Sequence, residues 1–248
     1  MTLKGKVALV TGSSEGVGRA VLEGLTDQGA DAVINYHSNS AAAETVRAGC
    51  EGKGVRAITV QADASSSDGV AALFEAATKE FGRIDIVVAN AGIEIVNVSL
   101  ADTTDEQFDR LNQINVKGSF LVLREAARRI SDNGRIITIS SNTTTVPQVG
   151  VAAYGSSKIA TNYLVRVLAL ELAPRGITVN TVVPGPIDGA GIFTDPAVNV
   201  EYRQALIKQI PIGRMGTTTD VAGVTNFLAS DAAGLITGQQ IVADGGMH

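Results

Sequence analysis

Short apolar runs alternate with longer amphipathic segments along most of the chain. Seven runs rich in β-branched residues predict strands, at Lys6–Thr11, Ala32–Asn35, Ala57–Gln61, Ile84–Asn90, Arg135–Ser140, Thr178–Val183 and Gln239–Val242. Segments of helical periodicity, the first of them Val17–Gln28, fill most of the gaps between these runs. Strands of continuous apolar character that helices separate indicate a parallel sheet covered on both faces. We therefore predict an α/β fold, a doubly wound and mainly seven-stranded parallel sheet of the Rossmann type.

The chain contains no linker, repeat or low-complexity tract, so we expect one domain over residues 1–248. One long irregular stretch runs from Pro184 to about Pro196, and a short helix and Pro211 follow it. A loop of this length inside a compact domain is usually functional or mobile. We expect it to form part of a substrate lid over about residues 185–212.

Composition excludes several classes of function. Twenty basic residues face 25 acidic ones, for a net charge of −5, and no Lys/Arg run occurs, which argues against nucleic acid or an anionic membrane as a partner. Cys50 is the only cysteine, which rules out an intramolecular disulfide or a thiolate metal cluster, and we expect no metal site. The N-terminal segment leads straight into the first strand, with no room for a signal peptide, and no apolar stretch is long enough to span a bilayer. We expect a cytoplasmic protein.

A glycine-rich turn follows the first predicted strand, with the sequence Thr11-Gly12-Ser13-Ser14-Glu15-Gly16-Val17-Gly18. Glycine lets the backbone turn sharply and approach a ligand, and the free amides of the helix that follows attract phosphate. The spacing is GxxxGxG rather than GxGxxG, so its position between the first strand and first helix carries the argument. The turn predicts a phosphate-binding site.

The same turn matches the GxSxG pattern of a serine nucleophile, at Gly12-Ser13-Ser14-Glu15-Gly16. A triad also needs a histidine, and the chain has only His37, just after the second strand, and His248 at its end. A nucleophile elbow also belongs deeper in a hydrolase sheet than its first strand. A serine hydrolase is therefore the weaker alternative.

Tyr154 and Lys158 stand one turn apart at the start of a long helix. A free phenol titrates near ~10, and a neighbouring cation lowers that pKa, which suits proton exchange with an alcohol or carbonyl oxygen. Ser140 and Ser141 end the fifth strand, at the edge where open α/β sheets bind ligands. The Ser141 hydroxyl there either binds a substrate carbonyl or caps a loop. Tyr154 and Lys158 either take part in proton transfer or form a solvated helix face.

Asn115 is a polar residue on the apolar stripe of a helix that we expect to begin near Thr103, with Glu106 completing a capping box. The inner stripe of this helix contains Phe108, Leu111, Gly118 and Val122. A buried amide costs stability unless it is hydrogen-bonded. Asn115 therefore either braces a neighbouring backbone segment or belongs to a catalytic site.

Over essentially its whole length, the chain resembles the short-chain dehydrogenase/reductase family. The matching features occur in family order, and they are the Gly12/Gly16/Gly18 turn, Asp63, Asn90-Ala91-Gly92, Asn115, Ser141, Tyr154 with Lys158, Pro184-Gly185 and the closing Asp244-Gly245-Gly246. Within the family the pattern is most similar to the 3-oxoacyl-carrier-protein reductase and glucose dehydrogenase group. The resemblance implies an oxidoreductase that moves a hydride between NAD(P) and a carbonyl or secondary alcohol. The alternative on the same fold is a non-catalytic dinucleotide-binding protein.

The resemblance also implies roles for single residues. Tyr154 would be the catalytic acid/base, and Lys158 would lower its pKa and hold the nicotinamide ribose. Ser141 would polarise the substrate oxygen, and Asn115 would anchor a water relay to Lys158. The implied cofactor-binding set is Gly12, Ser14, Glu15, Gly16, Val17, Gly18, Asn35, Tyr36, His37, Ser38, Asp63, Ala64, Asn90, Ala91, Gly92, Tyr154, Lys158, Pro184, Gly185 and Ile187. Gly189 departs from the family, which often has threonine there to contact the nicotinamide amide.

The end of the second strand bears on the choice of cofactor. Its sequence, Ile34-Asn35-Tyr36-His37-Ser38, lacks the acidic residue that would hold the ribose hydroxyls of NAD and repel the 2′-phosphate of NADP. No arginine stands there either, and many relatives that prefer NADP carry arginine where this chain has Glu15. We expect NADP(H) to be preferred, with NAD(H) possible.

The helix that begins at Tyr154 is apolar almost all round, so one face can cover the sheet and the other predicts a partner subunit. Relatives are commonly tetramers packed through this helix, and we expect a homotetramer. The expected lid carries five large apolar residues: Ile192, Phe193, Tyr202, Leu206 and Ile207. These residues suggest an uncharged, partly apolar pocket for a small carbonyl or alcohol. The alternative is that they only pack the short helix against the rest of the protein.

Overall fold

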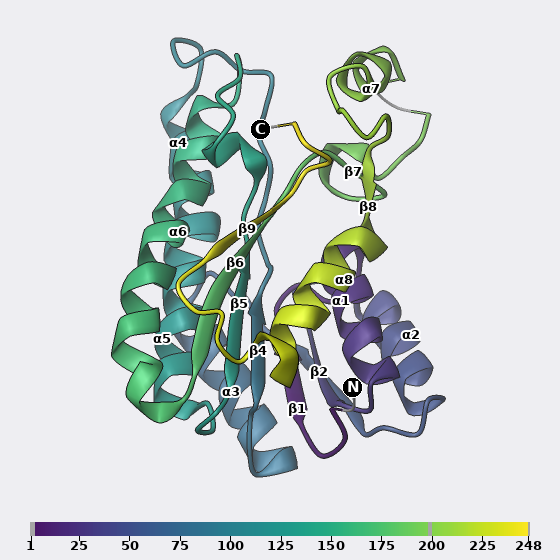
Figure 1. The fold of residues 1–248 in the computed structure, drawn as a ribbon, viewed down its shortest axis with the longest axis vertical. Coiled ribbons are helices and arrows are strands. Elements are labelled where there is room, and N and C mark those ends of the chain that lie inside the picture. Colours follow the sequence, from purple (N-terminus) through teal and green to yellow (C-terminus); the bar gives the residue numbers. More distant parts are fainter. Residues whose placement is uncertain (1–2, 198–199, 248) are drawn as a thin grey trace.

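A seven-stranded parallel sheet forms the centre of the molecule (Figure 1). We describe it from a computed structural model, which covers residues 3–197 and 200–247. The sheet order is β3-β2-β1-β4-β5-β6-β9. These strands are β1 (Val7–Val10), β2 (Asp31–Tyr36), β3 (Ala57–Gln61), β4 (Ile86–Ala89), β5 (Arg135–Ile139), β6 (Thr178–Pro184) and β9 (Gln240–Ala243). All seven predicted strands are present, with ends that differ by at most two residues, and the predicted fold class is confirmed.

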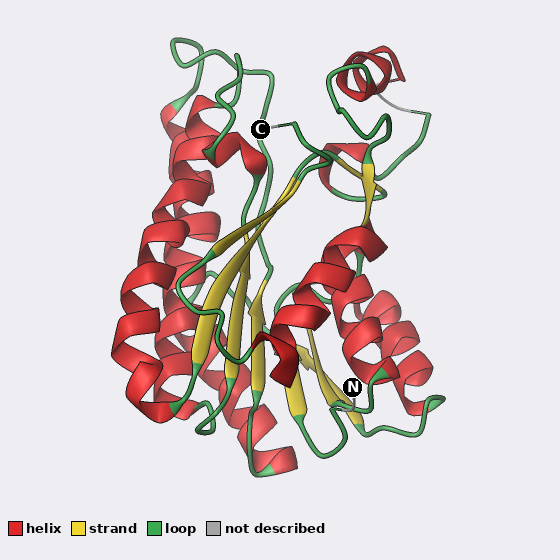
Figure 2. Ribbon diagram, viewed as in Figure 1, coloured by secondary structure: helices red, strands yellow, loops and turns green. Residues whose placement is uncertain are grey.

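Helices cover both faces of this sheet (Figure 2). One layer contains α1 (Gly16–Asp27), α2 (Ser40–Glu51) and α8 (Thr218–Ala229), and the other contains α3 (Ser67–Phe81), α5 (Ser119–Arg129) and α6 (Ala152–Leu172). Short 3₁₀ turns follow β5, α6 and α8, at η2 (Asn142–Thr144), η3 (Ala173–Arg175) and η5 (Asp231–Ala233).

The alternating side chains of β1 show why the sheet needs two helical layers. Successive residues of a strand point to opposite faces. Ala8 and Val10 pack in one apolar core, with residues of α1, α2 and α8, while Val7 and Leu9 pack in the other, with residues of α3, α5 and α6. All four are buried, so neither face of the strand can be polar.

The helix expected near Thr103 has its N-cap one residue later than predicted. α4 (Asp105–Leu111) has Thr104 as its N-cap, and Thr104 and Gln107 form the reciprocal capping box. The hydroxyl of Thr103 instead donates to the carbonyl oxygen of Ser99, at 2.9 Å. Phe108 was placed on the inner stripe, but its side chain is 49% exposed, so that prediction is wrong.

A π-helix continues α4 into α5. This segment, η1 (Asn112–Gly118), has seven residues and contains Asn115. A π turn has wider spacing than an α-helix, and such segments are frequent at functional sites. Asn115 and Gly118 are buried within it. The sequence pattern predicted a continuous helix here and did not indicate the change in winding.

A separate small unit follows β6. It contains the two-stranded sheet of β7 (Ile187–Asp188) and β8 (Gly216–Thr217), the short turn η4 (Gly191–Phe193) and helix α7 (Val200–Ile207). Phe193, Leu206, Ile210 and Met215 form its own apolar cluster. In Figure 1 the unit stands beyond the carboxyl end of the main sheet.

The order of the sheet places a ligand-binding crevice. The chain reverses its direction of winding between β1 and β4, and in open α/β sheets ligands bind at the carboxyl ends of the strands at this switch point. The turn after β1 and the segment after β4 therefore meet at one edge. In the described part of the chain, no helix has the length and apolar character needed to cross a membrane.

Candidate active site

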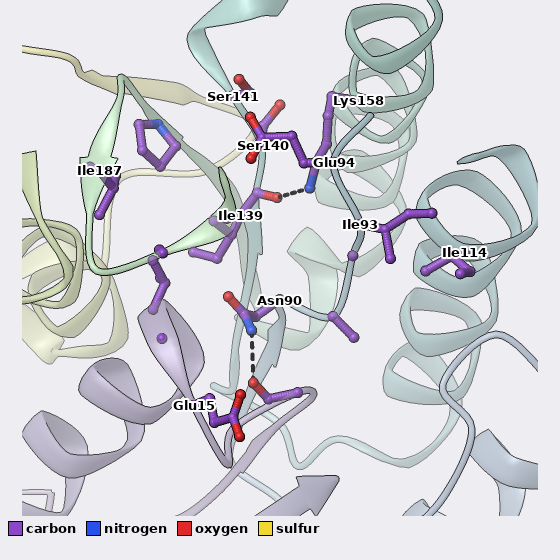
Figure 3. Close-up of a pocket in the computed structure, with 18 of the residues that line it drawn as sticks. Glu15, Asn90, Ile93, Glu94, Ile114, Ile139, Ser140, Ser141, Lys158 and Ile187 are labelled. Atoms are coloured by element: carbon purple, nitrogen blue, oxygen red, sulfur yellow. Dashed lines mark hydrogen bonds between the residues drawn. The ribbon is translucent and has the colours of Figure 1, made fainter. Parts of the chain in front are cut away.

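A cavity of about 660 Å³ opens at the carboxyl edge of the sheet. Its walls come from the loops that follow β1, β3, β4 and β5, from the start of α6, and from the segment after β6. Figure 3 shows Glu15 and Asn90 at one end of this cavity, and Ser141, Glu94 and Lys158 at the other. The two ends have different chemistry.

Buried amide side chains brace the glycine turn from behind. Asn35, at the end of β2, accepts a hydrogen bond from the backbone amide of Gly12 at 3.0 Å. Asn90, just after β4, donates to the carbonyl oxygens of Thr11 and Gly12, at 2.9 and 3.2 Å. Both residues border the cavity, but these amide groups are engaged by the turn. Their observed role is to hold the loop in shape.

Gly18 is a close-packing position within this arrangement. A Cβ atom there would collide with the carbonyl oxygen of Gly12 and the amide nitrogen of Asn90. Gly12 and Gly16 have positive φ angles, of 62° and 56°, a backbone region that favours glycine. The three glycines therefore allow the turn and α1 to approach each other.

The start of α1 offers hydrogen-bond donors to the cavity. Its N-cap residue, Glu15, makes no capping hydrogen bond, and the first turn of the helix contains no acidic residue. The first amides of a helix have no partners within it and carry the positive end of its dipole. Gly16 and Val17 border the cavity. This donor set fits the pyrophosphate of a dinucleotide cofactor.

Glu15 points to the neighbouring helix. Its carboxylate accepts a hydrogen bond of 2.5 Å from Asn39, the N-cap of α2. Asp63, after β3, also borders this end of the cavity, and Ser65 donates to its carboxylate through the backbone amide and the hydroxyl, at 2.8 and 2.7 Å. These two bonds lower the pKa of the Asp63 carboxyl. This end of the cavity is thus bordered by two acids.

Tyr154, Ser141 and Lys158 meet at the other end of the cavity. Tyr154 and Lys158 lie in the first turns of α6, and the Lys158 ammonium is 5.9 Å from the centre of the Tyr154 ring. The ammonium donates to the carbonyl oxygen of Ile139 at 3.2 Å. The Ser141 hydroxyl accepts from the amide and hydroxyl of Thr143, at 3.3 and 3.0 Å, so it also caps the turn after β5.

The pKa values in this cluster differ from the sequence-based expectation. Burial, reinforced by the negative charge of Glu94, raises the pKa of the Tyr154 phenol far above its usual value, and a hydrogen bond with Ser141 opposes the rise only in part. Burial also lowers the pKa of the Lys158 ammonium to about 8. The sequence predicts a lowered pKa for this phenol, and the structure differs because burial and the charge of Glu94 raise that pKa.

Asn115 holds three elements together from outside the cavity. Its side chain accepts from the amide of Ile93 at 2.9 Å and donates to the carbonyl oxygen of Ile93 at 2.9 Å. It also donates to the hydroxyl of Ser157, in α6, at 2.9 Å. The bracing interpretation of Asn115 is therefore observed, and Lys158 lies beyond its direct hydrogen bonds.

The cavity brings together most of the residues predicted for the site. Those that border it are Gly12, Glu15, Gly16, Val17, Asn35, His37, Asp63, Ala64, Asn90, Ala91, Gly92, Ser141, Tyr154, Lys158, Pro184, Gly185 and Ile187. Those outside its lining are Ser14, Gly18, Tyr36, Ser38 and Asn115. Gly18 and Asn115 act from behind the wall, and Tyr36 packs against the apolar core instead.

The sequence analysis missed Glu94. This half-buried acid lines the cavity at the same end as Tyr154, Ser141 and Lys158, and burial raises the pKa of its carboxyl. The expectation of an uncharged pocket is therefore wrong. Of the apolar lid residues, Phe193 borders the cavity, and Leu206 and Tyr202 pack with it in the lid core. An acid between two isoleucines, four residues after Asn90, was the available signal.

The backbone conformation at residue 189, where the family often has threonine, favours the glycine of this chain. Gly189 has a φ of 79°, which would strain any residue with a β-carbon. Its amide donates to the carbonyl oxygen of Phe193 at 3.0 Å and closes the turn. Among the described residues there is no group of three or more histidine, cysteine, aspartate or glutamate side chains arranged to bind a metal.

Comparisons with known proteins identify the family of this chain. The family model adh_short_C2, described as Enoyl-(Acyl carrier protein) reductase, matches residues 12–248. The chain is 41% identical over 258 residues to a versicolorin reductase of Emericella nidulans, which covers 98% of this chain and 96% of that protein. Among solved structures, a short-chain dehydrogenase from Burkholderia cenocepacia in complex with NADP is 36% identical, with a TM-score of 0.93 and coverage of 100% and 99% of the two chains. An angucycline C-6 ketoreductase with bound NADP is 37% identical, with a TM-score of 0.92 and coverage of 99% and 96%.

Proposed function

Because this chain belongs to the short-chain dehydrogenase/reductase family and is a nicotinamide-dependent oxidoreductase, we propose that it reduces small carbonyl compounds to alcohols, with Tyr154 as the proton donor. The family membership excludes the serine hydrolase and the non-catalytic dinucleotide-binding protein as readings of the sequence.

The meeting of Tyr154, Ser141 and Lys158 at one end of the cavity carries this proposal. When a reduced nicotinamide cofactor is bound, it supplies a hydride to the carbonyl carbon. Ser141 donates its hydroxyl proton in a hydrogen bond to the substrate oxygen, and Tyr154 transfers its phenolic proton to that oxygen as the carbonyl π bond breaks. Lys158 holds the ribose next to the nicotinamide, and its charge favours the phenolate that remains.

The protonation state of Tyr154 supports the reductive direction. Its raised pKa keeps the phenol protonated at neutral pH, ready to act as an acid. The reverse reaction needs the phenolate as a base, which burial and the charge of Glu94 disfavour.

The cofactor is a nicotinamide dinucleotide, and we propose a preference for NADP(H) with NAD(H) also accepted. Two structural relatives bind NADP. The end of β2 has no acid to repel a 2′-phosphate, and Asn35 is used to brace Gly12. Glu15 disfavours NADP(H), because its carboxylate, which bonds to Asn39, repels the negatively charged 2′-phosphate. This opposition is the reason to expect a moderate preference.

Three further features belong to the proposal. Residues 185–212 form the lid over the substrate. The homotetramer packs through the outward face of α6, where Ile159, Tyr163 and Leu170 are 52%, 67% and 79% exposed. Burial of such a row of apolar side chains against a second copy removes it from water. A cytoplasmic location stays a prediction.

A panel of neutral carbonyl compounds tests the proposed function. The purified protein is mixed with each compound and NADPH, and the loss of NADPH absorbance is followed, with NADH in parallel. We expect turnover of at least one ketone or keto ester, with a higher kcat/KM for NADPH than for NADH. Failure to reduce any aldehyde, ketone or keto ester would contradict the assigned reaction, and a strong preference for NADH would contradict the cofactor choice alone.

A further inference from the structure

Glu94 is a charged group inside the substrate end of the cavity that none of the roles above uses. It follows β4 in the segment whose neighbours Ile93, Ile95 and Val96 pack around Tyr154. Glu94 is therefore an acidic residue between apolar neighbours in this segment, and its side chain lines the cavity. Figure 3 shows Glu94 with Ser141 and Lys158 at the same end of the cavity.

The Glu94 carboxylate contacts the lid. It accepts a hydrogen bond of 3.1 Å from the backbone amide of Ile192, in η4. Gly191 has a φ of 57°, which favours glycine, and a Cβ atom there would displace the same carboxylate oxygen. One oxygen of Glu94 thus bonds to the backbone of the segment that follows β7.

No ion pair neutralises this charge in residues 3–197 and 200–247. Lys158 acts on Glu94 through its electric field, while the Lys158 ammonium is bonded to Ile139. The field of Glu94 also reaches Tyr154 and Tyr202, and raises the pKa of both phenols. An unpaired carboxylate that is partly removed from water costs stability, so its presence in a binding cavity points to a role there.

We propose that Glu94 selects substrates by charge, admitting neutral carbonyl compounds, especially those with a hydroxyl or other hydrogen-bond donor near the carbonyl, and rejecting those with a carboxylate or phosphate there. This inference rests on the proposed reductase function and extends it to the class of substrate. An anion beside Tyr154 would stand close to Glu94, and like charges repel each other. A neutral donor can instead bond to the carboxylate.

The change of Glu94→Gln isolates the charge, because the glutamine amide oxygen can still accept from Ile192. A keto ester that the wild type reduces is compared with the corresponding keto acid, for example methyl phenylglyoxylate with phenylglyoxylate. We expect the wild type to favour the ester, and Glu94→Gln to reduce the ester-to-acid ratio of kcat/KM by about tenfold, mainly through faster reduction of the acid. Glu94→Asp should keep the wild-type preference. The exposed Glu106→Gln makes the same charge change on α4 as a control and should leave the ratio unchanged.

Calorimetric binding of benzamide and benzoate to the NADPH-loaded protein gives the same contrast without turnover. A preference for benzamide that Glu94→Gln removes supports the assignment even if the carbonyl panel fails. An equal ratio in the wild type and Glu94→Gln, or binding of the two compounds that does not depend on residue 94, overturns it. Inactivity of the wild type toward all carbonyls, with the binding contrast intact, overturns the reductase function alone.

Discussion

At the scale of single residues, burial decides the chemistry of the Tyr154 and Lys158 pair. Spacing along a helix brings a phenol and an ammonium onto one face, which suggests mutual stabilisation of their charged forms. In the folded protein both groups are desolvated, and desolvation favours the neutral form of each. A protonated phenol that is also well placed is an acid ready for use. The direction of these shifts depends on tertiary burial, which no local pattern reports.

The pH dependence of cofactor binding tests this balance of charges. The pKa of Lys158 is about 8, so its ammonium is lost as the pH rises through that value, and we expect the affinity for NADPH to fall there. Burial lowers the pKa of Lys158, and the charge of Glu94 opposes that lowering in part. Glu94→Gln should therefore move the fall in affinity to lower pH, while Lys158→Arg, which stays charged, should abolish it. Fluorescence titration with NADPH from pH 6 to 10 measures all three proteins, and an unchanged midpoint in Glu94→Gln would contradict the proposed field.

At the scale of elements, the close approach of α1 to the turn after β1 shapes the cofactor end of the site. Gly18 permits that approach, since its missing side chain leaves room for Gly12 and Asn90. Asn90 and Asn35 then hold the turn through hydrogen bonds from two other strands. The free amides of α1 are presented to the cavity as a result.

Gly18→Ala tests this packing. We expect it to cost about 1–3 kcal/mol in the free energy of unfolding, because the added methyl group must displace backbone atoms, and to weaken NADPH binding. Gly49→Ala is the matched control, since Gly49 lies in α2 with open space around it and should gain up to about 1 kcal/mol from better helix propensity. Urea unfolding and NADPH titration measure both variants. Equal stability of the two variants would rule out the close-packing role.

Local sequence features were enough to predict much of the fold and part of the site. Apolar periodicity located the seven strands, and the glycine turn, Ser141 and Tyr154 are each defined by a short segment. The π-helix was not predicted: Asn115, which lies in it, bonds to Ile93 and Ser157, and no local pattern reports such tertiary contacts.

Two other features could not be predicted from the sequence, because they also depend on contacts outside the local segment. Glu94 meets Ile192 across 98 positions of sequence, a contact that only the assembled sheet creates. The capping box of α4 lies one residue later than predicted, and the Thr103 hydroxyl bonds to the carbonyl oxygen of Ser99 instead of capping the helix. Tertiary contacts, rather than propensities, decided each case.

At the scale of the whole molecule, the outward face of α6 is the main unpartnered apolar surface near the site. Tyr163 and Leu170 project from it, and Phe120 of α5 is also 43% exposed. A second copy packed on this face would also support the first turns of α6, which carry Tyr154 and Lys158. Assembly and catalysis would then be linked through one helix.

Leu170→Glu tests the proposed assembly. We expect the wild type to have four times the monomer mass by light scattering. The variant should have a lower mass, because burial of the glutamate charge in the subunit interface without a counter-charge is unfavourable. Its circular dichroism should be unchanged, because Leu170 is exposed in the single subunit. Leu100→Glu, which changes another exposed leucine in the loop before α4, is the control and should keep the wild-type mass. A monomeric wild type at micromolar concentration would refute the tetramer.

The comparison of the wild type with Tyr154→Phe tests the central claim most directly. The variant removes one oxygen and its proton, and the buried ring can stay in place. With a ketone that the wild type reduces, and with NADPH binding measured separately, we predict that kcat falls by about 100-fold or more while the affinity for NADPH is retained. Reduction by Tyr154→Phe at the wild-type rate would show that the proton comes from another group and would contradict the account.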